Sequence, residues 1–422
     1  MSEAHAPLLS LDEALARLIA GAATARITEI ETVATFDALG RVLAVDVVSA
    51  IDVPPADNTA MDGYAVRTID VLRAGQVLPV SQRIPAGMVG AALLGGSAAR
   101  IFTGAQVPAG ADAVVMQELC EAADGGSVRI NTVPQPGQWI RRRGEDVRVG
   151  ATVLTRGTPL TPQALGLAAG VGAATLRVVR RPRVALLSTG DELVMPGAVA
   201  PEALPPGAIY NSNRFTLRGL LQAAGCDVTD LGIVPDRLDA TRDALRRAAA
   251  AHDLILSSGG VSVGEEDHIR PAVAAEGRIE MWQVAIKPGK PLAFGAVRRG
   301  SAGASAGESL FVGLPGNPVS SFVTFLLAVA PVLRALQGLP AGLAQALSLP
   351  AHFDWPRPDR RREFLRVRRN AAGGLDLFAN QSSGVLTSAV WADGLVDNPP
   401  GQAIAHGDVV AYRPLASMIG CA

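Results

Sequence analysis

Both lysines of the chain, Lys287 and Lys290, lie in one pentapeptide, KPGKP, and every other basic residue is an arginine. A lysine ammonium is a compact point charge, which the planar guanidinium of arginine replaces poorly. Pro288 and Pro291 stiffen this turn, so the two charges are partly pre-organised. The pattern indicates a site for an oxyanion, either a phosphate or a tetrahedral metal oxide. A solvated turn is the alternative, and the absence of lysine elsewhere weakens it.

Two glycine-containing loops, SSGGVSVGEED (257–267) and LPGNP (314–318), follow apolar runs of strand type. Glycine lets the backbone approach a ligand closely, and the N-terminus of a following helix offers free N–H groups and a positive dipole. Both loops are therefore candidates for binding a phosphate or another oxyanion, through Gly259, Gly260, Ser262, Pro315, Gly316 and Asn317. For the first loop, a tight turn capped by acidic residues is an equally good interpretation. For the second, a purely structural helix cap at Asn317 is the commoner one, with Ser320 in the first helical turn.

Carboxylates stand at or near the ends of separate strand-like segments. They are Asp191 and Glu192 in STGDE, Asp236 in VPD and Asp267 at the end of the first glycine loop. Any single acid at such a place is more often a helix cap or a turn former. Acids that converge from separate strands near lysines indicate instead a site for Mg²⁺ and phosphate. The cluster therefore predicts such a site at this edge of the sheet.

From residue 183 onwards, strand-like runs alternate with helical segments. Such alternation is typical of a parallel α/β sheet covered on both faces, in which ligands bind outside the carboxyl ends of the strands. Polar, glycine-rich sequence stands at those ends, so we expect it to line one site: 188–192, 234–236, 257–267, 286–291 and 314–318. The predicted fold class is a multidomain α/β protein. It has a central, mostly parallel sheet, an N-terminal helix and β-lobe region, and a small C-terminal β-barrel.

Four domains follow from this interpretation. Residues 1–54 and 146–180 form an N-terminal helical and linking domain, 55–145 an inserted β-rich lobe, 181–338 the α/β domain, and 345–422 the β-barrel. A helix is expected over residues 8–22, because Ser10 with Glu13 three residues later is a capping-box pattern.

The composition argues against several classes of protein. The chain has 422 residues with a net charge of −1, whereas a general nucleic-acid binder usually carries a basic excess. Its three cysteines are dispersed, which argues against a zinc module and a disulfide framework and fits a reducing compartment. The N-terminus lacks a signal-type apolar stretch, and the most apolar segment, 322–333, is too short to cross a bilayer. We expect a cytoplasmic protein with no nucleic-acid or membrane partner.

Eight motifs, taken in order, resemble those of the MoeA-type molybdopterin molybdenumtransferases. They read PPADNTAMDGYAVR, IFTGAQVPAGADAVVMQE, RRRGEDV, LLSTGDEL, NSNRFTL, ILSSGGVSVGEEDH, IKPGKPLAFG and LPGNPVSSF. The resemblance implies the final step of molybdenum cofactor assembly, in which adenylylated molybdopterin and molybdate react in a Mg²⁺-dependent manner and AMP leaves. It also implies a homodimer, whose active-site cleft is shared between the α/β domain of one subunit and the N-terminal lobes of the other.

The resemblance also implies functional residues, which we transfer motif by motif. The matching positions are Asp62, Thr103, Asp146, Glu192, Asp236, Asp267, Lys287 and Lys290. The two lysines, with Ser320, Arg366 and Ser383, are expected to hold molybdate. Glu192, Asp236 and Asp267 would organise Mg²⁺ and the pyrophosphate link. Asp62, Thr103 and Asp146 would close the site from the partner subunit.

Two alternatives come from the same domain family. The adenylyltransferase that makes the preceding intermediate shares the α/β domain and the GGVS loop, but it would lack residues 1–180 and the C-terminal β module. A non-enzymatic scaffold that clusters receptors would carry an added domain and linker. The transferase interpretation also implies transient contact with the adenylyltransferase or with molybdoenzymes.

Overall fold

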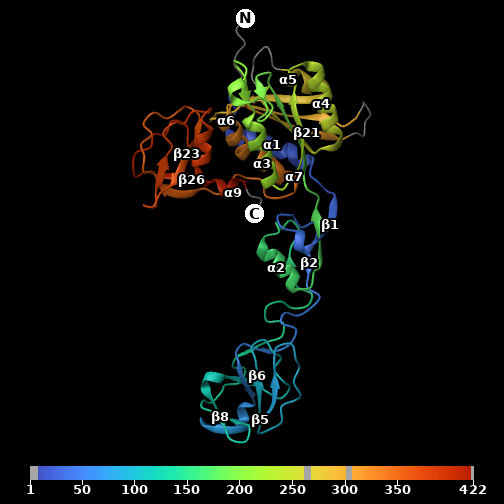
Figure 1. Ribbon diagram of the computed structural model, residues 1–422, viewed down its shortest axis with the longest axis vertical. Coiled ribbons are helices and arrows are strands. Elements are labelled where there is room, and N and C mark those ends of the chain that lie inside the picture. The colour runs from blue at the N-terminus through green and yellow to red at the C-terminus, as the bar shows by residue number, and fades with distance from the viewer. Residues whose placement is uncertain (1–7, 261–267, 301–306, 420–422) are drawn as a thin grey trace. The chain divides into compact units, whose positions relative to one another are not determined.

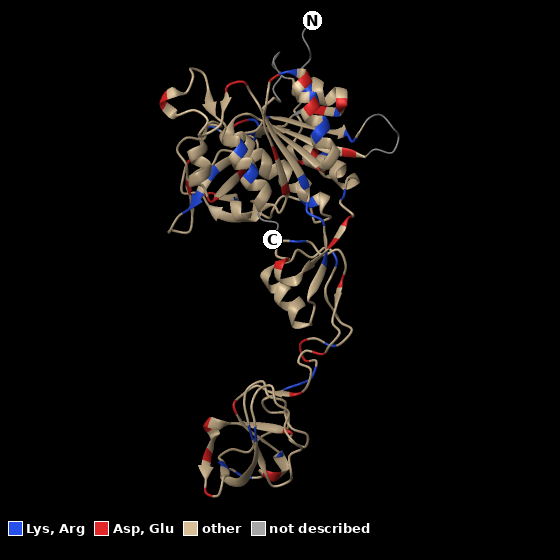
Figure 2. Cartoon of the chain, turned by 45° about the vertical axis from the view of Figure 1, so that its right-hand side comes forward, with Lys and Arg blue, Asp and Glu red and all other residues tan. Residues whose placement is uncertain are grey.

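The computed structural model describes residues 8–260, 268–300 and 307–419. The chain divides into two compact units (Figure 1). The first comprises Met1–Glu31, Gly40–Val42 and Val178–Ala422, and the second comprises Thr32–Leu39 and Leu43–Arg177. Figure 2 shows basic and acidic residues interspersed along the ribbon of each unit.

The first unit is built on a six-stranded sheet. Its strands lie in the order β16 (Asp227–Val234), β13 (Arg183–Thr189), β17 (Leu254–Ser258), β21 (Glu308–Leu314), β20 (Pro291–Arg298) and β18 (Gly277–Gln283). The three pairings among β16, β13, β17 and β21 are parallel, and the pairings β21–β20 and β20–β18 are antiparallel. The multidomain α/β class is confirmed, but the expectation of a mostly parallel sheet is wrong, since the sheet is mixed.

The short connections explain this difference. Residues 284–290 join β18 to β20, and residues 299–307 join β20 to β21. A parallel neighbour needs a crossover of a dozen or more residues, usually a helix, whereas antiparallel neighbours need only a turn. The alternation of strands and helices that begins at residue 183 stops at β18, so the antiparallel half of the sheet could have been read from connection lengths.

Helices cover both faces of this sheet. On one face α1 (Leu11–Thr24), α3 (Ser212–Ala223) and the helix that begins with α6 (Pro318–Thr324) bury Leu18, Leu217 and Val323 against Val184 and Leu186. The other face carries α4 (Leu238–Ala251) and α5 (Ile269–Glu276), packed against the side chains at 185 and 187. Alternate residues of β13 thus enter opposite cores, as the pleat of a strand requires.

Two helix starts follow the sequence signals closely. Ser10 caps α1 in a capping box, because the Glu13 backbone N–H donates to the Ser10 hydroxyl and the Glu13 carboxylate accepts from the Ser10 backbone N–H. The long helix begins at Pro318 after Asn317, as expected, although the Asn317 side chain makes no capping hydrogen bond. This helix runs through a π-helical segment, η5 (Phe325–Val329), into α7 (Ala330–Leu336).

The helix Pro318–Leu336 has 19 residues, so it is longer than the apolar segment singled out in the sequence. By length and composition it could cross a membrane, but 94% of its most apolar window is buried inside the fold. Its hydrophobicity is thus explained by its position in the core, since a helix that is apolar all round is a buried one.

The C-terminal part of the first unit is a second sheet with its own core. Its strands are β22 (Leu347–Pro350), β23 (Arg362–Arg369), β24 (Leu375–Leu377), β25 (Gly394–Asn398) and β26 (Val409–Pro414), with helices α8 (Leu386–Trp391) and α9 (Leu415–Ile419). The order is β19–β23–β25–β26–β22, with β24 also paired to β23. The edge strand β19 (Ile286–Lys287) comes from the α/β region. The lysine loop, by which we mean residues 286–291, therefore begins as part of the C-terminal sheet.

The second unit consists mainly of short strands. Six of them form a sheet in the order β7 (Ala113–Met116), β4 (Gly63–Val66), β6 (Ala98–Ile101), β5 (Gln76–Ile84), β9 (Ser127–Ile130) and β8 (Cys120–Ala123). Helix α2 (Pro162–Gly170) begins at a proline, after the N-cap Thr161.

The remaining strands form two-stranded sheets. These pairs are β1 (Ile30–Ala34) with β12 (Thr175–Val179), β2 (Val47–Val48) with β11 (Thr152–Leu154), β3 (Asn58–Thr59) with β10 (Ile140–Arg141), and β14 (Leu193–Val194) with β15 (Ile209–Tyr210). Short 3₁₀ helices are η1 (Thr35–Asp37), η2 (Thr68–Asp70), η3 (Gln117–Leu119) and η4 (Pro201–Ala203).

Candidate functional site

A pocket of about 810 Å³ lies at one edge of the α/β sheet, where β13, β17 and β21 end. Its walls come from segments that are far apart in the sequence. They are Thr189, Gly190, Glu192, Leu193, Ile209, Tyr210, Asn211, Ser212, Asn213, Asp236, Ser258, Gly259, Gly260, Pro291, Pro315, Gly316, Asn317, Pro318, Ser320 and Gly384. All five polar segments expected at the strand ends contribute residues to it. The volume is typical of sites for small molecules and cofactors.

The lysine loop reaches this edge for a different reason from the one expected. The loop precedes β20, and β20 runs antiparallel to β21. The start of β20 therefore lies beside the end of β21, and Pro291, the first residue of β20, lines the pocket. The lysine loop therefore lies at the predicted edge of the sheet, although β20 runs in the opposite direction to the one predicted.

The first glycine loop requires its glycines. Gly259 and Gly260 have φ angles of +88° and +68°, in the left-handed region that L side chains rarely adopt. A Cβ atom on Gly259 would lie 2.9 Å from the Thr189 carbonyl oxygen, and one on Gly260 would lie 2.5 Å from the Ile269 side chain. The loop thus brings bare backbone to the pocket wall.

Asn213 connects the first glycine loop to the second. Its Nδ2 donates to the Ser258 hydroxyl (3.0 Å) and to the Gly316 carbonyl oxygen (2.7 Å). Asn211 caps α3 through its Oδ1, which accepts from the Arg214 backbone N–H. These two asparagines lie in the NSNRFTL motif, but their types and spacing gave no signal of the partners at Ser258 and Gly316.

The two serines that follow the second loop, Ser320 and Ser321, have different surroundings. The Ser321 hydroxyl donates to the Pro315 carbonyl oxygen (2.6 Å) and so stabilises the turn. Ser320 lines the pocket instead, as expected, with Gly316 and Asn317 beside it. The Val319 backbone N–H donates to the Ser383 carbonyl oxygen (3.0 Å), which places the loop that contains Ser383 against the start of the helix.

Two of the three expected metal ligands, Glu192 and Asp236, line the pocket. The third, Asp267, lies outside the described residues, as does Ser262. Among the residues that the structure describes, no group of three His, Cys, Asp or Glu side chains could hold a metal ion. One or two carboxylates nevertheless suffice for Mg²⁺ when substrate phosphates and water complete its octahedron. The hard oxygen donors of this pocket fit that manner of binding.

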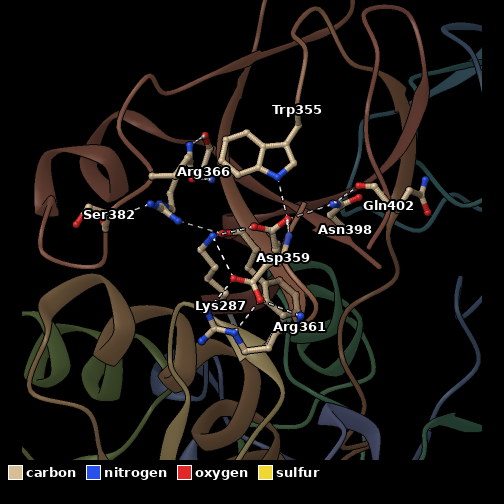
Figure 3. A network of polar contacts seen from close by, with 11 residues as sticks. Lys287, Trp355, Asp359, Arg361, Arg366, Ser382, Asn398 and Gln402 are labelled. Carbon is tan, nitrogen blue, oxygen red and sulfur yellow. Dashed lines mark hydrogen bonds and ion pairs between the residues drawn. The ribbon is translucent and has the colours of Figure 1, made fainter. Parts of the chain in front are cut away.

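Lys287 is engaged with two carboxylates of the C-terminal part (Figure 3). Its ammonium lies 3.2 Å from Glu363 Oε1 and 3.4 Å from Asp359 Oδ2. The pKa of Asp359 is held well below its usual range, mainly by its hydrogen bonds with the Arg361 side chain. Neither acid was predicted as a partner of Lys287, because a single carboxylate 72 or 76 positions away in the sequence gives no signal of such a pairing.

Lys290 has different surroundings. Within residues 8–260, 268–300 and 307–419, no carboxylate forms an ion pair with its ammonium. Its neighbour Pro291 lines the pocket. The two lysines of the pentapeptide therefore differ in net local charge.

Arg366 is a buried cation without an acidic partner among the described residues. Its side chain is only 1% exposed. The guanidinium donates to three neutral oxygens: the Ser388 hydroxyl (3.2 Å) and the carbonyl oxygens of Phe364 (3.2 Å) and Ser382 (3.4 Å). Burial lowers the pKa of Arg366 to about 10, so the group stays protonated at neutral pH. A charge buried in this way favours an anion nearby.

The remaining expected site residues lie in the second unit. The Asp62 carboxylate accepts from both the backbone N–H and the hydroxyl of Thr103, each at 2.7 Å. These two hydrogen bonds, that of the hydroxyl first, lower the pKa of Asp62. The Asp146 backbone N–H donates to the Val53 carbonyl oxygen, which holds the RGED segment in place. Asp62 and Thr103 thus form a hydrogen-bonded pair.

Family models match three stretches of the chain. They are the MoeA N-terminal region (domain I and II) over residues 9–172, a probable molybdopterin binding domain over residues 185–335, and the MoeA C-terminal region (domain IV) over residues 348–415.

Relatives and a solved structure cover most of the chain. A molybdopterin molybdenumtransferase of Haemophilus influenzae is 40% identical over 331 residues, which make up 78% of each chain. One of Synechococcus elongatus is 35% identical over 423 residues, 97% of this chain and 100% of the relative. A crystal structure of a molybdopterin biosynthesis moeA protein from Pyrococcus horikoshii matches with a TM-score of 0.80 at 29% identity, covering 96% of this chain and 99% of that one.

Proposed function

The chain belongs to the MoeA family, and we propose that it is a molybdopterin molybdenumtransferase. It is then a transferase of molybdenum cofactor biosynthesis, whose small-molecule substrates are adenylylated molybdopterin and molybdate and whose products include AMP. The observation that carries this proposal is the pocket at the sheet edge, in which two carboxylates, two glycine loops and the end of the lysine loop meet.

The pocket offers different chemistry at its different walls. Glu192 and Asp236 supply carboxylate oxygens, and Gly259 and Gly260 expose backbone to a ligand. Pro291 follows Lys290 directly, and Gly384 belongs to the loop whose Ser382 carbonyl oxygen accepts from Arg366. We assign the metal oxyanion to the wall formed by Pro291, Gly384 and Ser320, with Ser383 beside it. The pyrophosphate link then lies toward the carboxylates.

Glu192 and Asp236 are the described residues that would hold Mg²⁺, with Asp267 as an expected third ligand. When bound, this ion supplies positive charge that offsets the charge of the pyrophosphate. An oxygen of molybdate or of water attacks the adenylyl phosphorus, and the phosphoanhydride between molybdopterin and AMP breaks. The attacking oxygen leaves as part of AMP, and the phosphate of molybdopterin is the other product of the cleavage. The dithiolene sulfurs bind molybdenum, which gives up its bond to the attacking oxygen when that oxygen came from molybdate. Rate acceleration by this site depends on positioning and electrostatics, so no nucleophilic side chain is required.

Three finer points belong to the same proposal. The protein acts as a homodimer, in which Asp62, Thr103 and Asp146 of one subunit close the site of the other. The C-terminal strands form a small barrel, and the isolated bridge between Ala351, just after β22, and Leu375 of β24 supports this part of the proposal. The protein works in the cytoplasm and makes transient contact with the adenylyltransferase or with molybdoenzymes.

The test is release of AMP from adenylylated molybdopterin with and without molybdate, in the presence of Mg²⁺. The proposal expects AMP release that depends on both molybdate and Mg²⁺. Incubation with ATP and metal-free molybdopterin is the second arm. Accumulation of adenylylated product there, with no molybdate-dependent AMP release in the first arm, would assign the chain to the preceding adenylylation step instead.

A further inference from the structure

Glu363 is a carboxylate with 0% of its surface exposed, and all of its described partners are hydrogen-bond donors. Oε1 accepts from the Lys287 ammonium at 3.2 Å. Oε2 accepts from Trp355 Nε1 (2.8 Å), the Asp359 backbone N–H (3.1 Å) and Asn398 Nδ2 (3.5 Å). Figure 3 shows the Lys287 side chain directed toward this network. A buried carboxylate is costly unless it is paired and hydrogen-bonded, so Lys287 is its required counter-ion.

The backbone explains why these two side chains meet. Strand β19 pairs in parallel with β23, and Lys287 stands opposite Glu363 in the register. The Arg362 backbone N–H also donates to the Ala285 carbonyl oxygen at 2.9 Å. The first residues of the lysine loop are thus fixed to the C-terminal sheet, whereas its last residue, Pro291, lines the pocket.

Charge separates the two lysines of this loop. Lys287 faces two carboxylates, Glu363 and Asp359, and Arg361 pairs with Asp359, so these four charges sum to zero. The Lys287 ammonium therefore offers no net positive charge to an additional anion. Lys290 and Arg366 have no such acidic partner among the described residues.

We infer that Glu363 is a positioning residue for anion binding. By pairing with Lys287 it neutralises that lysine and fixes the KPGKP loop to the C-terminal sheet. The loop then presents Lys290, with Arg366, as the net positive charge for a tetrahedral oxyanion. This inference rests on the proposed function for the identity of the anion, molybdate, but it concerns binding of the anion alone.

The experiment compares anion binding and thermal unfolding in the full-length protein. Lys290→Met, Lys287→Met, Glu363→Gln and the double variant Lys287→Met/Glu363→Gln are titrated calorimetrically with molybdate in the absence of the pterin substrate. Glu308→Gln is the matched control, because Glu308 is an exposed carboxylate of the same unit, paired with Arg278. It is expected to bind molybdate like the unmodified protein.

We expect Lys290→Met to weaken molybdate binding at least tenfold at an unchanged Tm. Lys287→Met and Glu363→Gln should each lower the Tm and weaken binding, because either one leaves a charge without its partner where the loop meets the C-terminal sheet. The double variant removes both charges and keeps the backbone pairing of β19 with β23. Its Tm should therefore exceed that of Lys287→Met, and its affinity should return to within about threefold of the unmodified protein. Since such a rescue occurs without the Lys287 ammonium, it would show that this group does not contact the anion.

Two results would overturn the inference. One is a folded double variant that binds molybdate as weakly as Lys290→Met, which would make Lys287 a direct ligand. The other is a Glu363→Gln variant with a lowered Tm and unaltered molybdate affinity, which would leave Glu363 a purely structural role. If Glu363→Gln does not fold, Asp359→Asn removes the other carboxylate that pairs with Lys287, and its Tm and molybdate affinity are judged by the same criteria. A protein that binds molybdate as expected but releases no AMP would refute the proposed function and leave this inference standing.

Discussion

Replacement of Arg366 by methionine is the substitution whose effect follows most directly from the structure. The side chain is buried, its guanidinium reaches only neutral oxygens among the described residues, and one of them belongs to Ser382, beside the loop that forms the pocket wall at Gly384. Arg366→Met keeps most of the aliphatic volume and removes the charge. No carboxylate among the described residues loses a partner, so the usual penalty for a broken buried ion pair does not arise.

The size of the expected change in KM comes from the charged hydrogen bond to Arg366 that molybdate would no longer make. A hydrogen bond to a charged group contributes about 1.5–3 kcal/mol. We take about 2 kcal/mol, which corresponds to a factor of roughly thirty. The KM for molybdate should therefore rise about thirtyfold, while the kcat at saturating molybdate should change much less, since the loss lies in binding of one substrate.

The assay is the initial rate of AMP release as a function of molybdate concentration. Arg368→Met is the matched control, since Arg368 lies on the same strand, β23, but is exposed. The control should keep the original KM for molybdate. An Arg366→Met variant whose KM for molybdate equals that of the control would refute the assignment of this cation to the oxyanion end of the pocket.

Three further predictions concern stability. Asp253→Asn should lower the free energy of unfolding in urea by about 3–5 kcal/mol, because it breaks the buried pair in which Arg180 contacts both carboxylate oxygens; an effect below about 1 kcal/mol would contradict this. Ser10→Ala should lower the free energy of unfolding of the first unit by about 1 kcal/mol through loss of the capping box, and an unchanged urea midpoint would argue against it. Burial acts to raise the pKa of Asp397, but the hydrogen bonds and positive charges of Arg362 and Arg413 outweigh burial and hold that pKa below its usual value. The ionised Asp397 therefore stabilises the fold above about pH 4, and this stabilisation is lost as the pH falls further. Asp397→Asn should make the urea midpoint depend less on pH in the acid range, and an acid dependence as steep as that of the unmodified protein would contradict this prediction.

The parts of the fold that the sequence predicted well are those governed by local chemistry. The capping box at Ser10 and the helix start at Pro318 follow from spacing and from turn residues within a few positions. The direction of β20 and β18 was mispredicted, because it depends on connection length and not on the hydrophobic pattern. The lysine loop was nevertheless placed at the right edge of the sheet, because an antiparallel strand begins at the edge where its parallel neighbours end.

The loops of the site could be predicted from the sequence, but the residues that hold those loops by hydrogen bonds and ion pairs could not. Glycine loops, strand-end acids and the two lysines have recognisable types and spacing. Glu363, Asp359 and Asn213 have none, since each acts through a residue at least 45 positions away in the sequence. Pairings of this kind depend on how separate strands come into register, and that register is a tertiary property.

Diffraction from crystals soaked in tungstate, a heavy analogue of molybdate, tests the proposed site most directly, because anomalous scattering locates the anion without reference to activity. We expect one strong peak within the pocket, at the wall formed by Pro291, Ser320 and Gly384 and nearer to Lys290 than to Lys287. A strong peak outside this pocket, or a pocket that stays empty at saturating tungstate, would contradict the claim that this edge of the sheet binds the oxyanion.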